Sequence, residues 1–403
     1  MYRPNKSIEL FQMNGCEYLG NFENGTLIIV DKKRKKILDG FEYGKKFSKD
    51  DFIEDPEFLK ELQKGGFFES IEHPLCTAYF HVTNICNLNC IGCYSFDRTR
   101  NCSDKLSFDN IKYIVAQLAE NGVRTITISG GEPLIRNDIV GIVKYMKEKA
   151  GIETVNLITN GTLYNEERLL KLREYLDALP VSIDGYSYDH PHFLRDRGTF
   201  PRVMKFVAQA RDINLPVSIL PTLHRKNIDF INEYMKLSEK LKVPISFSLL
   251  TCSGGLENFI PTEDNLHNLV SFLFDFMKSG KVPMQDYSEL EARKNCGAGS
   301  SIISVTAEGD IYPCHMMHDT DTLMGNILRT PLKEILKNSK QVPTVDCIET
   351  CGDCEVRNVC GGGCKARALL LKGGWNQPDP YCVLNKQFYG QFVEEISKHG
   401  QSK

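Results

Sequence analysis

The segment TNICNLNCIGCYS, residues 83–95, decides how the rest of this chain is interpreted. Its cysteines, Cys86, Cys90 and Cys93, follow the spacing C-x3-C-x2-C. Three thiolates so close in the chain can ligate three irons of a four-iron cluster and leave the fourth iron without a protein ligand. Thiolates also bind zinc, so the alternative is a zinc knuckle with a fourth ligand elsewhere. The choice between these two sites depends on the remaining sequence.

The composition is that of an ordinary globular protein, long enough at 403 residues for two or three domains. The formal net charge of −3 argues against a general nucleic-acid-binding surface. The N-terminus lacks the features of a signal peptide, and no apolar run reaches the roughly 18 residues of a membrane-spanning helix. We therefore expect a cytoplasmic protein that binds neither nucleic acid nor membrane.

The fifteen cysteines are the unusual feature of this composition. Cytosolic thiols stay reduced, so clusters of cysteines in such a protein indicate metal rather than disulfides. Three cysteines lie at 86–93 and eight lie between 296 and 382. We expect the other four to be buried small hydrophobic residues: Cys16, Cys76, Cys102 and Cys252.

Between residues 73 and 284, short β-rich runs alternate with helical stretches. Six strand–helix units in succession predict a parallel, right-handed α/β sheet, either open or curled into a partial barrel. The expected strands are Ala78–Thr83, Thr125–Ser129, Thr154–Thr159, Pro180–Asp184, Val217–Thr222 and Ile245–Leu250. The expected helices are Phe108–Asn121, Asp138–Lys149, Glu166–Tyr175, Phe200–Asp212, Ile228–Leu241 and Asn265–Met277.

Polar and glycine-rich motifs follow the first four strands, where ligands bind in such sheets. In order they are the cysteine triplet, Ser129-Gly-Gly-Glu-Pro133, Thr159-Asn-Gly161 and Ser182-Ile-Asp-Gly185. This arrangement resembles the radical S-adenosylmethionine (SAM) superfamily. The resemblance implies a partial (β/α)6 barrel whose open iron chelates SAM. It also implies that one electron from the cluster cleaves SAM into methionine and a 5′-deoxyadenosyl radical.

The resemblance further implies which residues contact SAM. Gly130, Gly131 and Glu132 would contact the amino group of SAM, and Ser182 would contact its ribose or carboxylate. Asn160 would lie on the ribose side, and Arg195 would bind the carboxylate. Arg197 is close enough in sequence to be confused with Arg195. Two features depart from the family pattern. Gly92 replaces the aromatic residue common before the third cysteine, although Tyr94 supplies an aromatic ring next to it. Pro191-His192 replaces a His-Asp pair.

The C-terminal cysteines resemble the SPASM extension of radical SAM enzymes. Cys296, Gly309 and Cys314 precede the run Cys351-x2-Cys354-x5-Cys360-x3-Cys364, and Cys382 follows it. The resemblance implies an outer auxiliary cluster held by Cys351, Cys354, Cys360 and Cys382, and an inner one held by Cys296, Cys314 and Cys364. The fourth inner ligand is either Cys347 or an open iron that binds a substrate thiolate. A zinc ribbon is the alternative for residues 351–364 taken alone.

We expect residues 1–72 to form a separate unit without clustered metal ligands. Gly25–Asp31 is an expected strand, Ile8–Leu19 supplies one or two more, Lys32–Lys36 is an expected turn, and Pro56–Gly65 is an expected helix. This order resembles the winged-helix, PqqD-like domains that recognise the leaders of precursor peptides. The alternative is a cap that packs against the barrel. The expected domains are thus 1–72, the barrel at 73–284, SPASM at 285–385 and a terminal helix at 386–403.

Together these resemblances imply a peptide maturase with three [4Fe–4S] clusters and SAM. Its partners would be a precursor peptide with a leader and a flavodoxin or ferredoxin reductant, and its product a thioether or carbon–carbon crosslink. Anaerobic sulfatase-maturating enzymes are the nearer alternative, but they carry an aspartate base where this chain has His315. His315 is either a base with a pKa near neutrality or a structural histidine. A non-catalytic electron-transfer protein with several clusters is an alternative of another class.

Overall fold

The computed structural model describes residues 2–38, 41, 46–68, 75–95, 101, 106–251, 255–278 and 290–400, with side chains through residue 395. Cys102 and Cys252 lie outside these residues. The chain forms two compact units. The first consists of Met1–Pro74, Leu266–Cys296 and Pro343–Lys403, and the second of Leu75–Asn265 and Gly297–Val342. These units divide the chain at other positions than the domain boundaries expected from the sequence, which stay a prediction.

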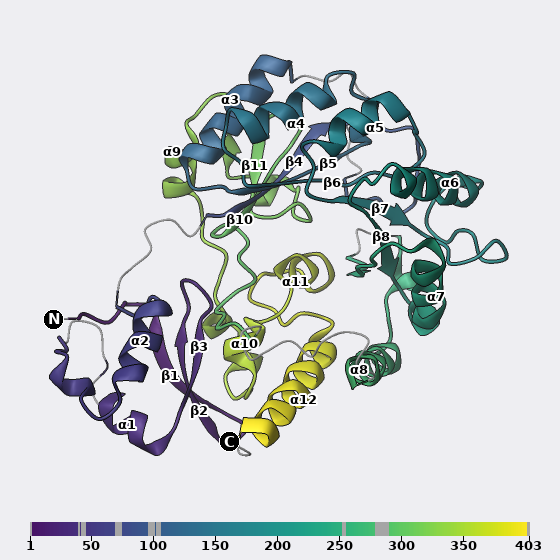
Figure 1. Ribbon diagram of the computed structural model, residues 1–403. Helices are drawn as coiled ribbons and strands as arrows, with labels where there is room; N and C mark the ends of the chain where they lie inside the picture. The colour runs from purple at the N-terminus through teal and green to yellow at the C-terminus, as the bar shows by residue number, and fades with distance from the viewer. Residues whose placement is uncertain are drawn as a thin grey trace. The chain divides into compact units, whose positions relative to one another are not determined.

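The second unit contains the predicted succession of parallel strands (Figure 1). β4 (Thr77–Thr83), β5 (Thr125–Gly130) and β6 (Thr154–Leu157) pair in one sheet, and β7 (Leu179–Ile183), β8 (Val217–Leu223) and β9 (Ser248–Leu249) pair in another. Parallel bridges from Asn156 to Ala178 and from Thr159 to Val181 join β6 to β7. The α/β prediction is confirmed. The last strand is shorter than expected, because Ile245 makes only an isolated bridge to Ile219.

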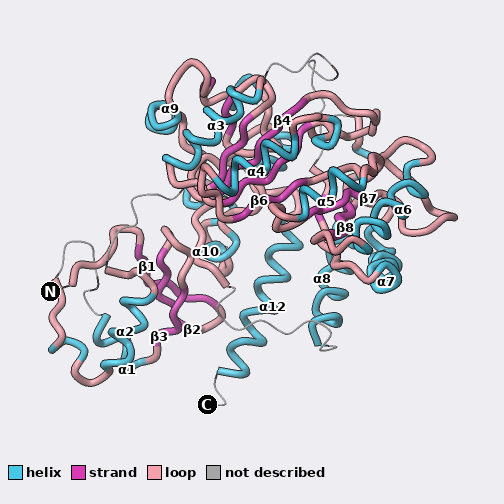
Figure 2. The backbone as a smooth tube through the Cα atoms, turned by 45° about the horizontal axis from the view of Figure 1, so that its top comes forward, coloured by secondary structure: helices cyan, strands magenta, loops and turns pink. Residues whose placement is uncertain are grey.

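Amphipathic helices follow the strands at the predicted places. They are α3 (Phe108–Glu120), α4 (Ile139–Glu148), α5 (Glu166–Arg173), α6 (Thr199–Asp212) and α7 (Ile231–Leu241). In α3, Ser107 and Asn110 form a reciprocal capping box, which satisfies backbone N–H groups that have no helical acceptor. α6 packs on β7 and β8, and α4 packs on β6, with the helices alongside the strands (Figure 2). This packing buries the apolar helix faces and leaves the carboxyl ends of the strands free for a site.

Part of the cysteine-rich region extends the sheet of the second unit. β10 (Ile302–Val305) pairs in parallel with β4, and the antiparallel β11 (Asp310–Tyr312) and β12 (Gly325–Asn326) follow. α9 (Leu332–Asn338) comes after β12. Cys314 and His315 lie just beyond β11. This segment and the cysteine triplet belong to the same compact unit.

The first unit begins with the antiparallel sheet β1 (Ile8–Met13), β2 (Cys16–Asn21) and β3 (Leu27–Val30), followed by α1 (Lys32–Leu38) and α2 (Pro56–Lys64). The predicted helix at Pro56–Gly65 is confirmed, with Asp55 as its N-cap. The predicted turn at Lys32–Lys36 is wrong, because these residues lie within α1. The Asp31 carboxylate accepts from the backbone N–H groups of Lys33 and Arg34 and so caps this helix.

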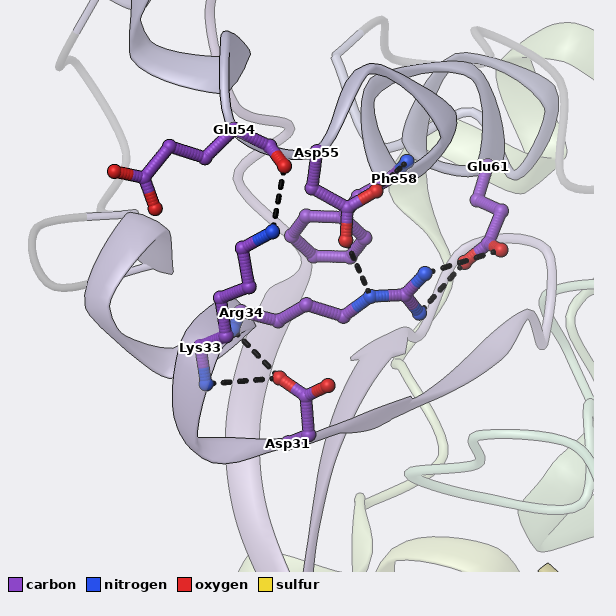
Figure 3. Close-up of polar contacts among 7 residues, drawn as sticks. All are labelled: Asp31, Lys33, Arg34, Glu54, Asp55, Phe58 and Glu61. Atoms are coloured by element: carbon purple, nitrogen blue, oxygen red, sulfur yellow. Dashed lines mark hydrogen bonds and ion pairs between the residues drawn. The ribbon is translucent and has the colours of Figure 1, made fainter. Parts of the chain in front are cut away.

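Arg34 joins α1 to α2, as Figure 3 shows. Its guanidinium donates to Asp55 over 3.2 Å and to Glu61 over 2.9 Å. It also lies 4.7 Å from the centre of the Phe58 ring. Two cations of this helical segment thus have acidic partners on neighbouring elements, because Lys35 also pairs with Glu17 of β2 over 2.5 Å.

Both faces of the N-terminal sheet are covered. One face packs on the helices of the same region through Leu19, Val30, Phe58 and Leu62. The other contributes Met13 and Tyr18 to a core that includes residues of α8 (Glu263–Lys278), α10 (Arg357–Cys360) and α12 (Cys382–Gly400). The apolar residues added by those helices are Val270, Phe274, Val359, Phe392 and Val393. The N-terminal sheet and the C-terminal cysteine segment therefore share one core.

The two described cysteines outside the clusters have different environments. Cys16 packs partly buried against the shared core, as expected. The expectation of burial is wrong for Cys76, which is exposed and lies just before the first residue of β4. Within the described residues, no helix is long and apolar enough to cross a membrane.

Candidate active site

A pocket of about 410 Å³ opens at the carboxyl ends of the parallel strands in the second unit. Every strand from β4 to β9, or the loop after it, contributes to its wall. The predicted site residues in this wall are Cys86, Cys90, Cys93, Tyr94, Gly130, Gly131, Asn160, Ser182, Arg195 and His315. Residues more than two hundred positions apart in the sequence thus line the same pocket. Glu132 is the predicted contact that is not in the lining.

The two glycines of the GGEP segment allow the loop after β5 to touch the loop that carries the cysteines. Gly130 has φ +117°, and a Cβ atom there would lie 2.3 Å from the carbonyl oxygen of Thr83. A Cβ on Gly131 would lie 2.1 Å from the carbonyl oxygen of Ile85. The backbone N–H groups of Gly131 and Glu132 donate to these same two carbonyls. Only glycine permits this contact, which holds the start of the cysteine loop.

Glu132 lies behind the pocket wall and is completely buried. One carboxylate oxygen accepts from the Leu134 N–H and the Thr159 hydroxyl, and the other accepts from the Asn160 N–H. Burial raises the pKa of this carboxyl, although these hydrogen bonds oppose the shift. In this structure Glu132 joins the GGEP turn to the loop after β6. Its contact with a ligand amino group stays a prediction.

Asn160 contributes to the pocket and also fixes the cysteine loop. Its side-chain amide donates to the Asn87 side chain over 2.8 Å and lies 3.9 Å from the sulfur of Cys86. Its carbonyl oxygen accepts from the Thr162 N–H and hydroxyl. Because its donor and acceptor are both engaged by protein, the orientation of the amide beside Cys86 is fixed.

The two arginines that the sequence could not separate have different environments. Arg195 lines the pocket and lowers the pKa of Cys90, which burial nevertheless raises to about 11. Arg197 is exposed. The backbone of Arg195 is held by Asp184, whose carboxylate accepts from three consecutive N–H groups at residues 193–195.

Asp196, a residue that the sequence did not single out, connects this arginine loop to the cysteines. Its carboxylate accepts from the Asn89 N–H, and the neighbouring Leu194 carbonyl accepts from the Ile91 N–H. The cysteine loop is thus held by backbone contacts from both the GGEP and arginine loops. Leu256 occupies the space that a side chain at position 92 would need, because a Cβ atom on Gly92 would lie only 2.1 Å from the Leu256 Cδ1.

His315 is enclosed by aromatic rings at the edge of the pocket. Its ring stacks on Tyr79 at 3.9 Å between centroids, and Tyr94 meets it edge-on at 5.4 Å. Burial lowers the pKa of His315 to about 3, well below the near-neutral value of the base alternative, which favours the structural one. The histidine is neutral at physiological pH and lies beside Cys314, with Nδ1 3.6 Å from the sulfur. Its role as a base stays a prediction.

The first unit brings together the cysteines assigned to the outer cluster. Cys351, Cys354, Cys360 and Cys382 line one small cavity together with Gly362 and Gly363. The N–H groups of these glycines donate to the Cys360 sulfur and oppose the effect of burial, which raises the pKa of that thiol to about 12. Four thiols with backbone donors around a common space suit an iron–sulfur cluster.

The inner-cluster cysteines of the first unit have a charged surrounding. The Cys364 N–H donates to Asp379, which also forms a buried ion pair with Arg367. Lys365, the next residue, is fully buried. Burial lowers the pKa of Lys365, and the thiols of Cys296, Cys351, Cys347 and Cys360 oppose that change. Cys347 itself is exposed. Cys314 belongs to the other unit.

A site for a single metal ion needs a different arrangement of ligands from a site for an iron–sulfur cluster. In the described parts of the chain, no three histidine, cysteine, aspartate or glutamate side chains are grouped to hold one metal ion. The thiols are instead distributed around cavities, and a four-iron cluster presents separate irons to its ligands. The backbone contacts at Gly130 and Gly131 and the donors to Cys86 and Cys360 fit such a group.

Comparison with known families agrees with this arrangement. Residues 80–237 match the radical SAM superfamily, and residues 296–355 match SPASM, an iron–sulfur cluster-binding domain. The chain is a radical SAM enzyme with a SPASM domain. The radical SAM domain implies a [4Fe–4S] cluster and SAM, and the SPASM domain binds additional iron–sulfur clusters. The assignment of the triplet to the SAM cluster stays a prediction.

The curated relatives of this radical SAM enzyme are named for different activities. The AdoMet-dependent heme synthase of Methanosarcina barkeri is 27% identical over 337 residues, which are 75% of this chain and 95% of the relative. The mycofactocin maturase MftC of Mycobacterium tuberculosis is 26% identical over 351 residues, which are 81% of this chain and 86% of the relative.

Two solved structures show the same fold at low sequence identity. Native anSMEcpe with bound AdoMet is similar with a TM-score of 0.65 and 19% identity, covering 81% of this chain and 100% of that one. Streptococcus suis SuiB bound to the precursor peptide SuiA has a TM-score of 0.60 and 15% identity, covering 95% of this chain and 100% of that one. The second match omits fewer residues than the N-terminal 72, so the likeness in fold extends into that region.

Proposed function

We propose that this radical SAM enzyme modifies a ribosomally made precursor peptide and forms a thioether or carbon–carbon crosslink in it. The observation that carries the proposal is the likeness to SuiB, which covers 95% of the chain and includes its N-terminal region. That structure holds a precursor peptide, and MftC and PqqA peptide cyclase are peptide-modifying relatives by name. SAM and its cluster, when bound, would supply a radical that abstracts hydrogen from carbon.

The residues of the pocket would bind and orient SAM and exclude water. Gly130 and Gly131 give backbone access to the ligand, and Arg195 offers a cation suited to its carboxylate. Glu132 lies behind these groups and Asp184 lines the same pocket, and both fix the loops that carry them. Auxiliary clusters in the SPASM domain, two if all eight C-terminal cysteines take part, would accept the electron that the substrate loses when the crosslink forms. A flavodoxin or ferredoxin would reduce the SAM cluster.

We assign leader binding to the N-terminal sheet. β3 is an edge strand, and its Ile29 is 41% exposed. An extended leader could add to this edge through main-chain hydrogen bonds, with side-chain contacts supplying selectivity. The opposite edge, β1, carries the similarly exposed Leu10 at 42% and provides a matched comparison.

The enzyme test uses anaerobically reconstituted protein, SAM, a chemical reductant and short peptides encoded beside the gene. We expect 5′-deoxyadenosine together with a peptide that has lost two hydrogen atoms for each crosslink. A peptide left unchanged while 5′-deoxyadenosine accumulates would contradict a peptide substrate. Formation of formylglycine from a cysteine or serine peptide would instead favour the sulfatase-maturase alternative. No 5′-deoxyadenosine at all would favour a non-catalytic electron-transfer protein.

The leader test measures binding of a fluorescent leader peptide to the full chain. Ile29→Asp on β3 is expected to weaken binding about tenfold, which corresponds to about 1.4 kcal/mol, and Leu10→Asp on β1 should leave it nearly unchanged. Equal effects of the two substitutions would argue against addition to β3.

A porphyrin substrate is the second candidate, because several relatives are named AdoMet-dependent heme synthases. Incubation with iron porphyrin precursors, followed by detection of heme, distinguishes it from peptide modification. Heme formation without peptide modification would replace our proposal.

A further inference from the structure

Lys365 is a lysine with no exposed surface, at the first position of α11 (Lys365–Lys372). This helix and the neighbouring α10 and α12 belong to the first unit and carry or follow most of its cysteines (Figure 1). A buried ammonium loses its hydration and must be compensated by acceptors or anions. The partners of Lys365 therefore indicate what this part of the molecule is built to hold.

The protein supplies little of this compensation. The Lys365 ammonium donates to one backbone carbonyl, that of Trp375, over 3.4 Å. In the described part of the chain, no carboxylate forms an ion pair with it. Arg367, two residues later on the same helix, is the opposite case, because its guanidinium has two hydrogen bonds to Asp379. The charge of Lys365 is thus left for another anionic group.

The groups around Lys365 belong to both auxiliary sites. It directly follows Cys364 of the inner site, and a Cβ atom on Gly362, which lines the outer-site cavity, would lie 3.3 Å from its Nζ. The thiols of Cys296, Cys351, Cys347 and Cys360 also act on its charge. Cys296 and Cys347 are assigned to the inner cluster, and Cys351 and Cys360 to the outer one. A single ammonium therefore lies within electrostatic reach of ligands of both clusters.

We propose that Lys365 is the shared counter-charge of the two auxiliary clusters and favours their reduced states. This proposal rests on the two-cluster assignment in the proposed function. Adding one electron to a [4Fe–4S] cluster makes it more negative by one charge, and a nearby ammonium stabilises the product more than the reactant. Lys365 would thereby help both clusters to accept the electron that leaves the substrate. It is a positioning residue that acts through the clusters.

The test is a mediated redox titration of the anaerobically reconstituted full-length protein, followed by electron paramagnetic resonance. Lys365→Met removes the charge and keeps a long apolar side chain, whereas Lys365→Arg keeps the charge. Lys372→Met removes an exposed lysine from the other end of the same helix and serves as the control. Iron content is measured first, because wild-type protein without auxiliary clusters would refute the cluster assignment itself rather than the role of Lys365.

In Lys365→Met we expect the equilibrium constant for one-electron reduction of the auxiliary clusters to fall about tenfold, a shift of about 59 mV to lower potential. Lys365→Arg, Lys372→Met and the SAM cluster should keep wild-type potentials. Loss of auxiliary irons in Lys365→Met but not in Lys365→Arg would also support the proposal. Unchanged potentials in a fully loaded Lys365→Met protein would overturn it. Loss of irons in both variants would overturn it as well, because shape rather than charge would then be required.

Discussion

Glu132→Gln tests whether the carboxylate of the GGEP segment connects two loops or binds the ligand directly. The buried carboxylate accepts three hydrogen bonds, at 3.0 Å from Leu134, 2.8 Å from Thr159 and 2.7 Å from Asn160. Glutamine has the same shape but only one oxygen. Whichever way its amide is turned, its NH2 group faces a backbone N–H, and at least one buried donor loses its acceptor.

An unsatisfied buried donor costs about 1–3 kcal/mol. For a unit of this size, 2 kcal/mol lowers the thermal-unfolding midpoint by roughly 4–8 °C. Thr159→Ser is the matched control, since its hydroxyl still donates to the carboxylate and still accepts from the Gly161 N–H. We expect it to cost less than about 1 kcal/mol, because it removes only one buried methyl group. The assays are anaerobic thermal unfolding and calorimetric titration with SAM.

The two outcomes are separable. If Glu132 connects the loops, Glu132→Gln lowers the unfolding midpoint clearly more than Thr159→Ser does, and SAM affinity falls only as far as the loops loosen. A Glu132→Gln protein with wild-type stability and SAM binding weakened more than about tenfold would refute this reasoning. It would show that the carboxylate is needed by the ligand amino group, as the family resemblance implies.

Three further changes have defined outcomes. Gly131→Ala places a methyl group 2.1 Å from the Ile85 carbonyl, so the cysteine loop should shift and the iron assay should lose about four irons; full iron content would contradict this. Burial lowers the pKa of His224 from 6.5 to about 4, so the folded state resists protonation and stability falls by up to about 3 kcal/mol between pH 6.5 and 4. His224→Asn should flatten this part of the stability–pH curve, and an unaltered curve would argue against it. Arg34→Met removes the ion pairs and the Phe58 contact of α1, costs about 1 kcal/mol and should speed hydrogen exchange in that helix, whereas unchanged protection would show that these contacts contribute nothing.

The barrel and most of its pocket were predictable because their signals are local. Strand periodicity and the motifs after β4, β5, β6 and β7 lie within short segments, and the carboxyl ends of parallel strands meet by geometry. The positions of Cys86, Gly130, Asn160 and Arg195 in one wall follow from this rule. The same rule does not tell which side chain faces the pocket and which lies behind it. Glu132 lies behind because its partners belong to another loop.

The unpredicted features depend on contacts between distant segments. The basic run at Lys32–Lys36 is helical because Arg34 meets Asp55 and Glu61, although Asp31 was a capping signal present in the sequence. Nothing local distinguishes Lys365 from the surface lysines of this chain. Its burial depends on how α11 packs among the cysteine loops.

The shared core of the first unit limits how its N-terminal sheet can be studied. Met13 and Tyr18 are buried with Val356 and Val359 of the cysteine segment, and Cys354 and Cys360 pack against the same core. Deleting residues 1–72 would therefore expose the apolar support of the outer cluster as well as remove the sheet. Loss of activity after such a deletion would not identify a leader-binding function. Point substitutions at the exposed edge of β3, which leave this core intact, are the changes that can separate recognition from cluster stability.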